Sequence, residues 1–328
     1  MNKQKIKQDD RVFIAGANGM AGKAIKRNLL NSGYDFLFTP SRNELNLFNL
    51  EDVKKWFLKN KPDVVVVAAA KVGGIMANSS QPSEFLLDNL KIQNNLIETA
   101  WKSDVKRLLF LGSSCIYPKF SSQPIKEEEL LTGSLEKTNQ WYSIAKISGI
   151  MLCEALRLQY GFDAISLMPT NLYGPGDNYH PLNSHVMASL IRKFYKAKKE
   201  SFPEVVCWGS GSPYREFLHV DDLGKAAVFA LENWDPKAPD APLNKDGFPL
   251  FILNVGTGKE ISIKELAYKI ANIFEYQGKI EWDKNKPDGT PRKLLNIDKI
   301  KSLGWRPSIS LENGIMNTIN SLTEELHL

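Results

Sequence analysis

A tyrosine and a lysine stand four residues apart in the run Tyr142-Ser-Ile-Ala-Lys146. On a helix, residues at this spacing share a face, so the phenol and the ammonium would be neighbours. A lysine beside a tyrosine favours the phenolate, which suits the hydroxyl for proton transfer to a carbonyl oxygen near neutral pH. The same spacing also occurs on ordinary solvated helix faces, so its meaning depends on the rest of the chain.

Glycines recur at every third position in the run Gly16-Ala-Asn-Gly19-Met-Ala-Gly22. An apolar stretch from Arg11 to Ala15 precedes them, and an amphipathic stretch from Met20 to Leu30 follows. Strand, glycine turn and helix are typical of dinucleotide-binding folds, where the backbone and the helix N-terminus approach the phosphates. We therefore predict a nucleotide site here, with an ordinary glycine-rich turn as the alternative.

The segment Phe36-Leu-Phe-Thr-Pro-Ser-Arg42 stands where the cofactor ribose is usually recognised, about twenty residues after the glycine loop. No carboxylate that would accept an NAD 2′-hydroxyl ends this segment. Ser41 and Arg42 instead offer a hydroxyl and a guanidinium, which match a 2′-phosphate in charge and geometry. The sequence therefore favours NADP, used as NADPH, and the alternative is a loop arginine that faces water.

A serine and a cysteine follow directly after the apolar run at 107–111, in Ser113-Ser-Cys115. The carboxyl end of a parallel strand borders the ligand crevice, and residues two apart in an extended chain point to one side. Ser113 and Cys115 are therefore expected in one pocket. A single cysteine is more often a small buried residue, which is our interpretation of Cys153 and Cys207. His185, taken alone, could equally be a surface or structural histidine.

Strand-like and helix-like segments alternate along much of the chain. Continuous apolar runs at 62–70, 107–113 and 164–168 suit parallel strands buried on both faces, and helical patterns lie near 90–101 and 142–160. We predict an α/β fold: a Rossmann-type doubly wound parallel sheet over 1–173, with a return segment near 245–275. Residues 174–244 and 276–328 are assigned to a smaller C-terminal substrate-binding domain. The spacing Ser262-Ile-Lys-Glu265 predicts a capped helix start.

The composition, 43% hydrophobic and 24% charged over 328 residues, is ordinary for a globular protein. A net charge of +5 is spread over 42 basic and 37 acidic residues, so no nucleic-acid partner is expected. Three widely spaced cysteines and the lack of a long apolar run favour a cytoplasmic protein without a membrane partner. The helix expected over 142–160 is apolar on more than one side, which favours a homodimer. No metal site is expected.

The glycine loop, Ser113, Tyr142 and Lys146 together resemble the extended short-chain dehydrogenase/reductase family. Longer runs are similar to one branch of that family, whose members act on GDP-4-keto-6-deoxy-D-mannose. They cover nearly the whole chain: Ala69-Ala-Lys-Val-Gly-Gly-Ile75, Leu111-Gly-Ser-Ser-Cys-Ile-Tyr-Pro118, Met168-Pro-Thr-Asn-Leu-Tyr-Gly-Pro175, Asn183-Ser-His-Val186, Trp208-Gly-Ser-Gly211, Arg215-Glu-Phe-Leu-His-Val-Asp-Asp222 and Lys286-Pro-Asp-Gly-Thr-Pro-Arg-Lys293.

The resemblance implies an NADPH-dependent 3,5-epimerisation and 4-reduction of that keto sugar to GDP-L-fucose. The C4 ketone acidifies the C–H bonds at C3 and C5, and Cys115 and His185 match the family's base and acid at these carbons. Tyr142 would donate a proton to the C4 oxygen while Ser113 hydrogen-bonds it. Lys146 would tune Tyr142 and contact the cofactor ribose.

The resemblance also implies the binding residues. Those expected to contact the cofactor are Gly16, Asn18, Gly19, Met20, Gly22, Ser41, Arg42, Ala69, Leu111, Lys146, Pro169, Asn171 and Leu172, and those expected to contact the substrate are His185, Lys193, Trp208, Arg215 and Asp288. Lys193 replaces a more usual arginine and lacks its bidentate fork. Asn18 stands where the family often has an arginine at the 2′-phosphate, so the preference for NADP rests on Ser41 and Arg42, and use of NAD stays open.

Two alternatives remain. The first is another nucleotide-sugar enzyme of the same family, such as a 4-epimerase or a 4,6-dehydratase. A dehydratase would carry an acidic pair after the strand-end serine, where this chain has Cys115-Ile-Tyr117. The second is a non-catalytic NADP-binding sensor. Such proteins typically lose the serine, the tyrosine or the lysine, and this chain retains all three.

Overall fold

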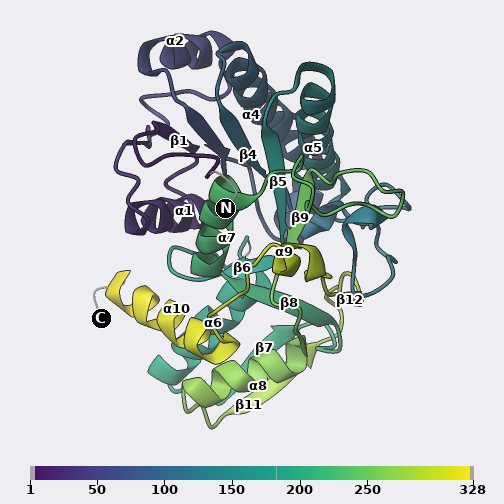
Figure 1. Cartoon of the computed structure of the whole chain (residues 1–328). Coiled ribbons are helices and arrows are strands. Elements are labelled where there is room, and N and C mark those ends of the chain that lie inside the picture. The colour runs from purple at the N-terminus through teal and green to yellow at the C-terminus, as the bar shows by residue number, and fades with distance from the viewer. Residues whose placement is uncertain (1–3, 182, 326–328) are drawn as a thin grey trace.

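A six-stranded parallel sheet organises the upper lobe of the molecule (Figure 1), with its strands in the order β2-β1-β3-β4-β5-β9. This is the predicted Rossmann-type doubly wound sheet. The computed structural model describes residues 4–181 and 183–325. The strands of this sheet are β1 Val12–Ala15, β2 Leu37–Phe38, β3 Val64–Val67, β4 Arg107–Leu111, β5 Ala164–Pro169 and β9 Ile252–Val255.

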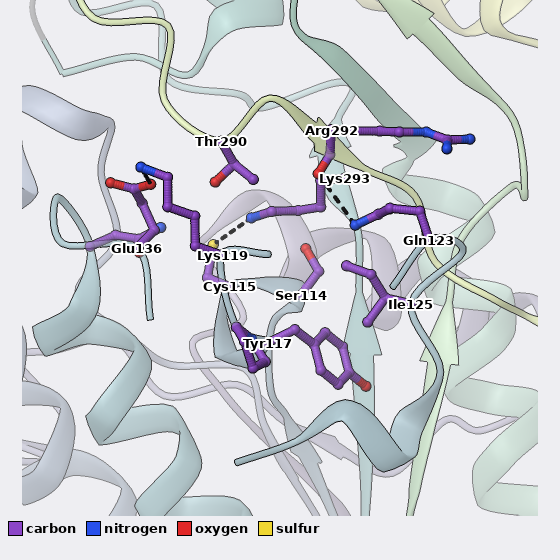
Figure 2. A pocket seen from close by; sticks show the side chains of 12 residues that line it. Ser114, Cys115, Tyr117, Lys119, Gln123, Ile125, Glu136, Thr290, Arg292 and Lys293 are labelled. Carbon is purple, nitrogen blue, oxygen red and sulfur yellow. Dashed lines mark hydrogen bonds and ion pairs between the residues drawn. The ribbon is translucent and has the colours of Figure 1, made fainter. Parts of the chain in front are cut away.

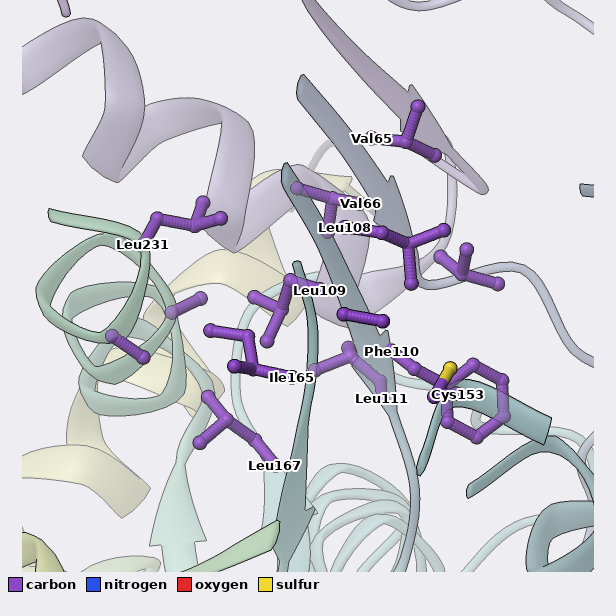
Figure 3. Close-up of a cluster of buried hydrophobic side chains, with 14 of the residues drawn as sticks. Val65, Val66, Leu108, Leu109, Phe110, Leu111, Cys153, Ile165, Leu167 and Leu231 are labelled. Atoms are coloured by element: carbon purple, nitrogen blue, oxygen red, sulfur yellow. The ribbon is translucent and has the colours of Figure 1, made fainter. Parts of the chain in front are cut away.

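Helices cover both faces of this sheet, which explains why its central strands are apolar at successive positions. Strands β1, β3, β4 and β5 are buried at every residue. Figure 3 shows side chains of β3, β4 and β5, among them Val66, Leu109 and Ile165, together in the main core. Helix α4 packs against α2 and α5, whereas α1 packs against α7 (Figure 1). These helices are α1 Met20–Asn31, α2 Leu50–Asn60, α4 Pro82–Lys102, α5 Gln140–Tyr160 and α7 Val220–Asn233; a short helix, α3 Ile75–Ser80, precedes α4.

The lower lobe has a second hydrophobic core, which includes Phe194, Leu266 and Ile315. One sheet there joins β6 Asn171–Tyr173, β8 Tyr214–His219, β10 Glu260–Ser262 and β12 Arg292–Lys293, and β7 Glu204–Trp208 pairs with β11 Lys279–Asp283. The helices around this core are α6 Val186–Lys199, α8 Ile263–Ile273 and α10 Leu311–Glu325. The predicted capping box at the start of α8 is present, because Ser262 and Glu265 exchange both hydrogen bonds.

Each of the two hydrophobic cores is built from segments that are far apart in the sequence. Helix α7, assigned above to 174–244, packs on α1, and α9 (Asp298–Ser302), assigned to 276–328, contacts β9 of the main sheet. Conversely, β10 and α8, within the return segment 245–275, belong to the lower lobe. Periodicity predicts the type of an element, but it does not tell which of two cores receives its apolar face.

The carboxyl ends of β3, β4 and β5 lie at the edge of the main sheet that faces the lower lobe (Figure 1). After β4 the chain enters a short 3₁₀ helix, η1 Ser114–Ile116, and a second one, η2 Glu127–Glu129, follows in the same connection. Strand β12 pairs with β8 so that Lys293 lies opposite Arg215. Residues from both lobes are thereby brought to one seam. In the described parts of the chain, no helix has the length and apolarity needed to cross a membrane.

Candidate active site

The glycine loop joins β1 to α1 and has the geometry of a phosphate-binding turn. Gly16 has a φ of +85°, and a Cβ there would lie 2.6 Å from the backbone nitrogen of Ala69. A Cβ at Gly22 would overlap the carbonyl oxygen of Gly16. Gly19 begins α1 without a side-chain cap, so the N–H groups of the first turn are left for another acceptor. Such an N-terminus fits a dinucleotide pyrophosphate.

The edge beyond β2 carries positive charge from two elements. Arg42 is exposed there, and the Ser41 N–H donates to Oε2 of Glu44 at 2.7 Å. Lys26 reaches this edge from α1, with Nζ 3.4 Å from Oγ1 of Thr39. We did not predict Lys26, although its place one turn after Gly22 in the helix is a usable signal. Two cations at this edge suit a 2′-phosphate.

The other predicted cofactor residues lie along the same edge of the sheet. Asn18 is exposed on the glycine loop and Met20 begins α1. Ala69 follows β3 and Leu111 ends β4. Pro169 ends β5, and Asn171 and Leu172 begin β6, where the Asn171 Nδ2 group donates to the carbonyl of Glu216 at 2.7 Å. Strand β6 also pairs with β8, so the edge is continuous with the lower lobe.

Tyr142 and Lys146 occupy successive turns at the start of α5. Lys146 Nζ donates to the Leu111 carbonyl at 2.7 Å and lies 5.9 Å from the centre of the Tyr142 ring. Burial lowers the pKa of Lys146 to about 7. Burial also raises the pKa of Tyr142 well above its usual value; the charge of Cys115 adds to this, and a hydrogen bond with Ser113 opposes it. Desolvation thus outweighs the lysine here, contrary to the expectation from sequence, and keeps the phenol in its proton-donating form.

Ser113 and Cys115 meet near Tyr142, but not by strand alternation. Ser113 is extended, with φ −165°, and caps η1, where its Oγ accepts from the Cys115 N–H at 3.2 Å. Cys115 lies inside this 3₁₀ turn, so the expected extended geometry is wrong. Both residues nevertheless influence Tyr142, the serine through a hydrogen bond and the cysteine through its charge. The 3₁₀ turn therefore brings Ser113 and Cys115 together, and the sequence spacing alone does not predict this turn.

Cys115 lies in a pocket between η1 and β12. Lys293 Nζ donates to its Sγ at 3.5 Å, and Figure 2 shows the lysine side chain running toward the sulfur. Glu136, on the wall of the same pocket, pairs with Lys119 at 2.7 Å (Figure 2). The lining residues are Ser114, Cys115, Tyr117, Pro118, Lys119, Gln123, Ile125, Glu136, Asn139, Thr290, Arg292 and Lys293. Lys293 was not among the predicted site residues, although it ends one of the runs that carry the resemblance.

His185 stands at the N-terminus of α6, where its side chain makes no capping hydrogen bond. His185 keeps an exposed surface, but the protein around it partly desolvates the imidazole and lowers its pKa, and the positive charge of Lys293 lowers it further. The same lysine therefore acts on His185 and on Cys115. A lowered pKa makes the imidazolium a stronger acid and also leaves less of it at neutral pH.

Lys193 and Trp208 lie together in the lower lobe, as predicted from the motifs. Lys193 Nζ donates to the Val206 carbonyl at 2.7 Å and lies 5.5 Å from the centre of the Trp208 ring. Lys286, which was not predicted, places its Nζ 5.3 Å from the same ring. The indole is half-exposed between these elements, and two ammonium groups beside it offer attraction to an anionic nucleotide.

Arg215 and Asp288 are joined through the backbone of the late loop. The Arg215 Nη2 group donates to the Asp288 carbonyl at 3.2 Å. The Asp288 carboxylate accepts from Ser210 N–H at 2.7 Å and from Ser210 Oγ at 2.8 Å. Asp288 therefore holds the loop after Trp208 in place. Among the described residues, no group of three or more His, Cys, Asp or Glu side chains is placed to hold a metal ion.

The chain is similar in sequence and in fold to proteins that have been named or solved before. The profile of the NAD dependent epimerase/dehydratase family matches residues 12–244. A rice protein (Oryza sativa subsp. japonica) named probable GDP-L-fucose synthase 1 is 50% identical over 317 residues, 96% of this chain and 93% of its own length. The GDP-L-fucose synthase of Escherichia coli (strain K12) is 50% identical over 308 residues, 94% of this chain and 95% of its own. A solved GDP-mannoheptose C4 reductase from Campylobacter jejuni with NADP bound is 34% identical, with a TM-score of 0.86 over 97% of this chain and 99% of the other.

Proposed function

Because the chain belongs to the NAD dependent epimerase/dehydratase family, we propose that it converts GDP-4-keto-6-deoxy-D-mannose to GDP-L-fucose with NADPH. Both curated relatives described above are named for GDP-L-fucose synthesis. The observation that carries the proposal is the pair Cys115 and His185, which share Lys293 as a charged neighbour close to Tyr142. A simple ketone reductase needs Tyr142 but has no use for a second base and acid.

The cofactor fits the edge formed by the glycine loop and the end of β2. When bound, NADPH supplies the hydride for C4. The first-turn N–H groups of α1 would hold its pyrophosphate, and Arg42 and Lys26 would hold its 2′-phosphate. Lys146, fixed by the Leu111 carbonyl and 5.9 Å from the centre of the Tyr142 ring, would contact the ribose. The NADP-bound reductase from Campylobacter jejuni supports this choice of cofactor.

The reduction uses Tyr142 as a proton donor. The phenol gives its proton to the C4 oxygen, and Ser113, which is already hydrogen-bonded to Tyr142, orients that oxygen. The phenolate left behind is stabilised by the ammonium of Lys146, one helical turn away, until solvent returns the proton.

The epimerisation uses the C4 ketone to acidify C3–H and C5–H. The Cys115 thiolate accepts the proton from carbon, the electron pair moves to the C4 oxygen, and Ser113 and Tyr142 stabilise that oxygen by hydrogen bonds. The His185 imidazolium then returns a proton to the opposite face of the ring, which inverts the centre. Cys115 and His185 regain their starting states by exchange with solvent.

The test is to incubate the purified protein with GDP-4-keto-6-deoxy-D-mannose and NADPH and to identify the sugar nucleotide by NMR. We expect GDP-L-fucose, formed in equal amount to the NADPH oxidised. A 4-reduced product with unchanged C3 and C5 would contradict the epimerase half. Tight NADPH binding with no turnover would favour a sensor instead.

We also propose that the protein is a cytoplasmic homodimer that associates through α4 and α5. The outer faces of these helices expose Leu87, Met151 and Leu158, which are 51%, 40% and 70% accessible. Apolar exposure over two adjacent helices favours contact with a second copy. The Leu158→Glu variant should change the mass measured by light scattering from dimer to monomer. Leu30→Glu, on α1 of the other helix pair, is the control and should leave the mass unchanged.

The three free cysteines suit a reducing compartment such as the cytoplasm.

A further inference from the structure

We propose that Lys293 is the positioning residue for the base of the epimerisation: its ammonium stabilises the negative charge on Cys115. The inference rests on the proposed function, because it assigns a role within that same site. Its starting point is the contact of Lys293 Nζ with Cys115 Sγ at 3.5 Å (Figure 2). A thiolate, not a thiol, is the form that accepts a proton, and an adjacent cation favours that form.

The ammonium is available to the sulfur because nearby carboxylates have other partners. Glu136, in the wall of the same pocket, is paired with Lys119 at 2.7 Å. Glu260, which lies across the sheet, is paired with Arg292 at 2.7 Å. Each of these carboxylates therefore has a different cation as its direct partner, although the charge of Lys293 also helps to lower the pKa of Glu136. Lys293 makes its hydrogen bond in the pocket to Cys115.

The backbone that carries Lys293 is fixed on three sides. Lys293 pairs with Arg215 across β12 and β8. The next residue, Leu294, donates its N–H to Gln123 Oε1 at 2.8 Å, and its carbonyl accepts from Ile125 N–H at 2.7 Å. The lysine side chain therefore starts from a backbone that cannot shift without breaking these bonds.

A buried carboxylate completes this support. Glu216 Oε2 accepts from the Leu295 N–H at 2.9 Å. Its Oε1 accepts from the N–H groups of Thr257 and Gly258 at 2.6 Å and 2.7 Å. Glu216 thereby clamps the chain just after Lys293 to the loop that follows β9. Glu216 follows Arg215 directly in β8, so the strand that supports the backbone after Lys293 also carries a predicted substrate-binding residue.

The charges that face this pocket come from four elements besides β12. Tyr142 on α5 and Arg215 on β8 both respond to the charge of Cys115. His185 at the start of α6 responds to Lys293, and Glu136 with its partner Lys119 borders the opposite wall. Lys293 is the cation in direct contact with the sulfur, so its removal should change the thiolate more than removal of any other charge in this set.

The proton transfer balances with this assignment. The thiolate takes the proton from C3 or C5, so that S–H forms as C–H breaks and the electron pair moves to the C4 oxygen. The ammonium of Lys293 lies in contact with the sulfur that carries the negative charge before this transfer.

The test measures the reactivity of Cys115 without substrate. Iodoacetamide alkylation is followed from pH 6 to 9, with the modified peptide identified by mass spectrometry; Cys153 and Cys207 are buried and serve as internal references. We expect Lys293→Met to slow alkylation of Cys115 at pH 7 about tenfold, because the cation beside the sulfur is lost. Lys293→Arg should restore most of the rate. Lys126→Met, which removes an exposed lysine from the connection between η1 and η2, is the control and should stay near wild type.

Three results would overturn the proposal. The first is wild-type alkylation in a folded Lys293→Met protein, and the second is an equal loss in Lys126→Met. If Lys293→Met does not fold, Lys293→Gln is used instead, because it keeps a hydrogen-bond donor without the charge. The third result is then alkylation of Cys115 in Lys293→Gln at the wild-type rate. The proposed function is judged separately by the product of the wild-type enzyme. Slow alkylation in the variant together with no GDP-L-fucose from the wild type would retain the role of Lys293 and reject the function.

Discussion

The two halves of the candidate site are built in different ways. The reductive half, Ser113, Tyr142 and Lys146, comes from the end of β4 and from α5, which belong to one core. The epimerising half, Cys115, His185 and Lys293, comes from η1, α6 and β12. Its central contact joins residues 178 positions apart in the chain. The hydride chemistry therefore rests on the nucleotide-binding frame alone, whereas the carbon-acid chemistry depends on how the two lobes meet.

Because the two halves come from different elements, the reductase and epimerase activities should be separable by mutation. A change on α5 alters the reductive half but leaves the base and the acid of the seam in place, and a change at the seam leaves the nucleotide edge intact. The predictions below test that separation, from the largest expected effect to the smallest.

Tyr142→Phe should reduce hydride transfer about a thousandfold, because the proton donor to the C4 oxygen is lost. Exchange of the C3 and C5 protons with deuterated solvent should continue at a measurable rate, since Cys115 and His185 remain. NADPH oxidation and NMR of the substrate carbons measure the two activities in one sample. If both fall together while NADPH affinity is unchanged, the two halves are not separable.

Cys115→Ser should lower the exchange at C3 and C5 about a hundredfold, because a hydroxyl is a far weaker acid than a thiol and supplies little ionised base. NADPH affinity, measured by fluorescence titration, should change little because the sulfur lies outside the nucleotide edge. Formation of GDP-L-fucose at a near wild-type rate would show that Cys115 is a structural residue and that another base acts.

Lys146→Met should raise the free energy of unfolding at pH 7 by roughly 1–3 kcal/mol, because a buried amine is replaced by an apolar side chain. Its folded pKa of about 7 lies below the unfolded value, so the unfolded chain binds more protons between about pH 7 and 10. Wild-type stability should therefore rise with pH across that window, and the advantage of the variant should shrink. Urea unfolding at several pH values measures this.

The control for that experiment is Lys102→Met, on the exposed side of α4, which should leave the unfolding free energy within about 0.5 kcal/mol of wild type. An equal stabilisation by both substitutions would mean that burial of Lys146 is not the cause. A stability difference that does not depend on pH would contradict the lowered pKa.

Arg42→Ala should raise the KM for NADPH about tenfold and leave that for NADH almost unchanged, because the lost contact exists only with the 2′-phosphate. Lys26→Ala should act in the same direction, from the other side of the edge. Initial rates with each cofactor measure both variants. Equal effects on NADPH and NADH would show that Arg42 does not read the phosphate.

The sequence allowed the reductive half to be predicted because its signals are local. The glycine loop follows its strand directly, Tyr142 and Lys146 are one helical turn apart, and Ser113 comes two residues after the end of β4. The epimerising half was reached only through the resemblance, because no spacing links Cys115 to His185. The geometry expected for Cys115 was wrong, since a 3₁₀ turn replaces the extended chain.

Three lysines were missed for one physical reason. Lys26, Lys286 and Lys293 acquire their partners through tertiary contacts with Thr39, Trp208 and Cys115. From sequence alone, a lysine in a polar segment is interpreted as a solvated charge. Its sequence neighbours do not show which group its flexible side chain contacts in the fold. The core that α7 or β10 joins is likewise set by tertiary contacts in the folded chain.

The most direct measurement is the reaction of the wild-type protein in deuterated water, with GDP-4-keto-6-deoxy-D-mannose and NADPH, followed by NMR of the product. The account predicts GDP-L-fucose with deuterium at C3 and C5, taken from solvent, and hydrogen at C4, taken from the cofactor. A product that carries hydrogen at C3 and C5, or deuterium at C4, would contradict a single site with two separate halves.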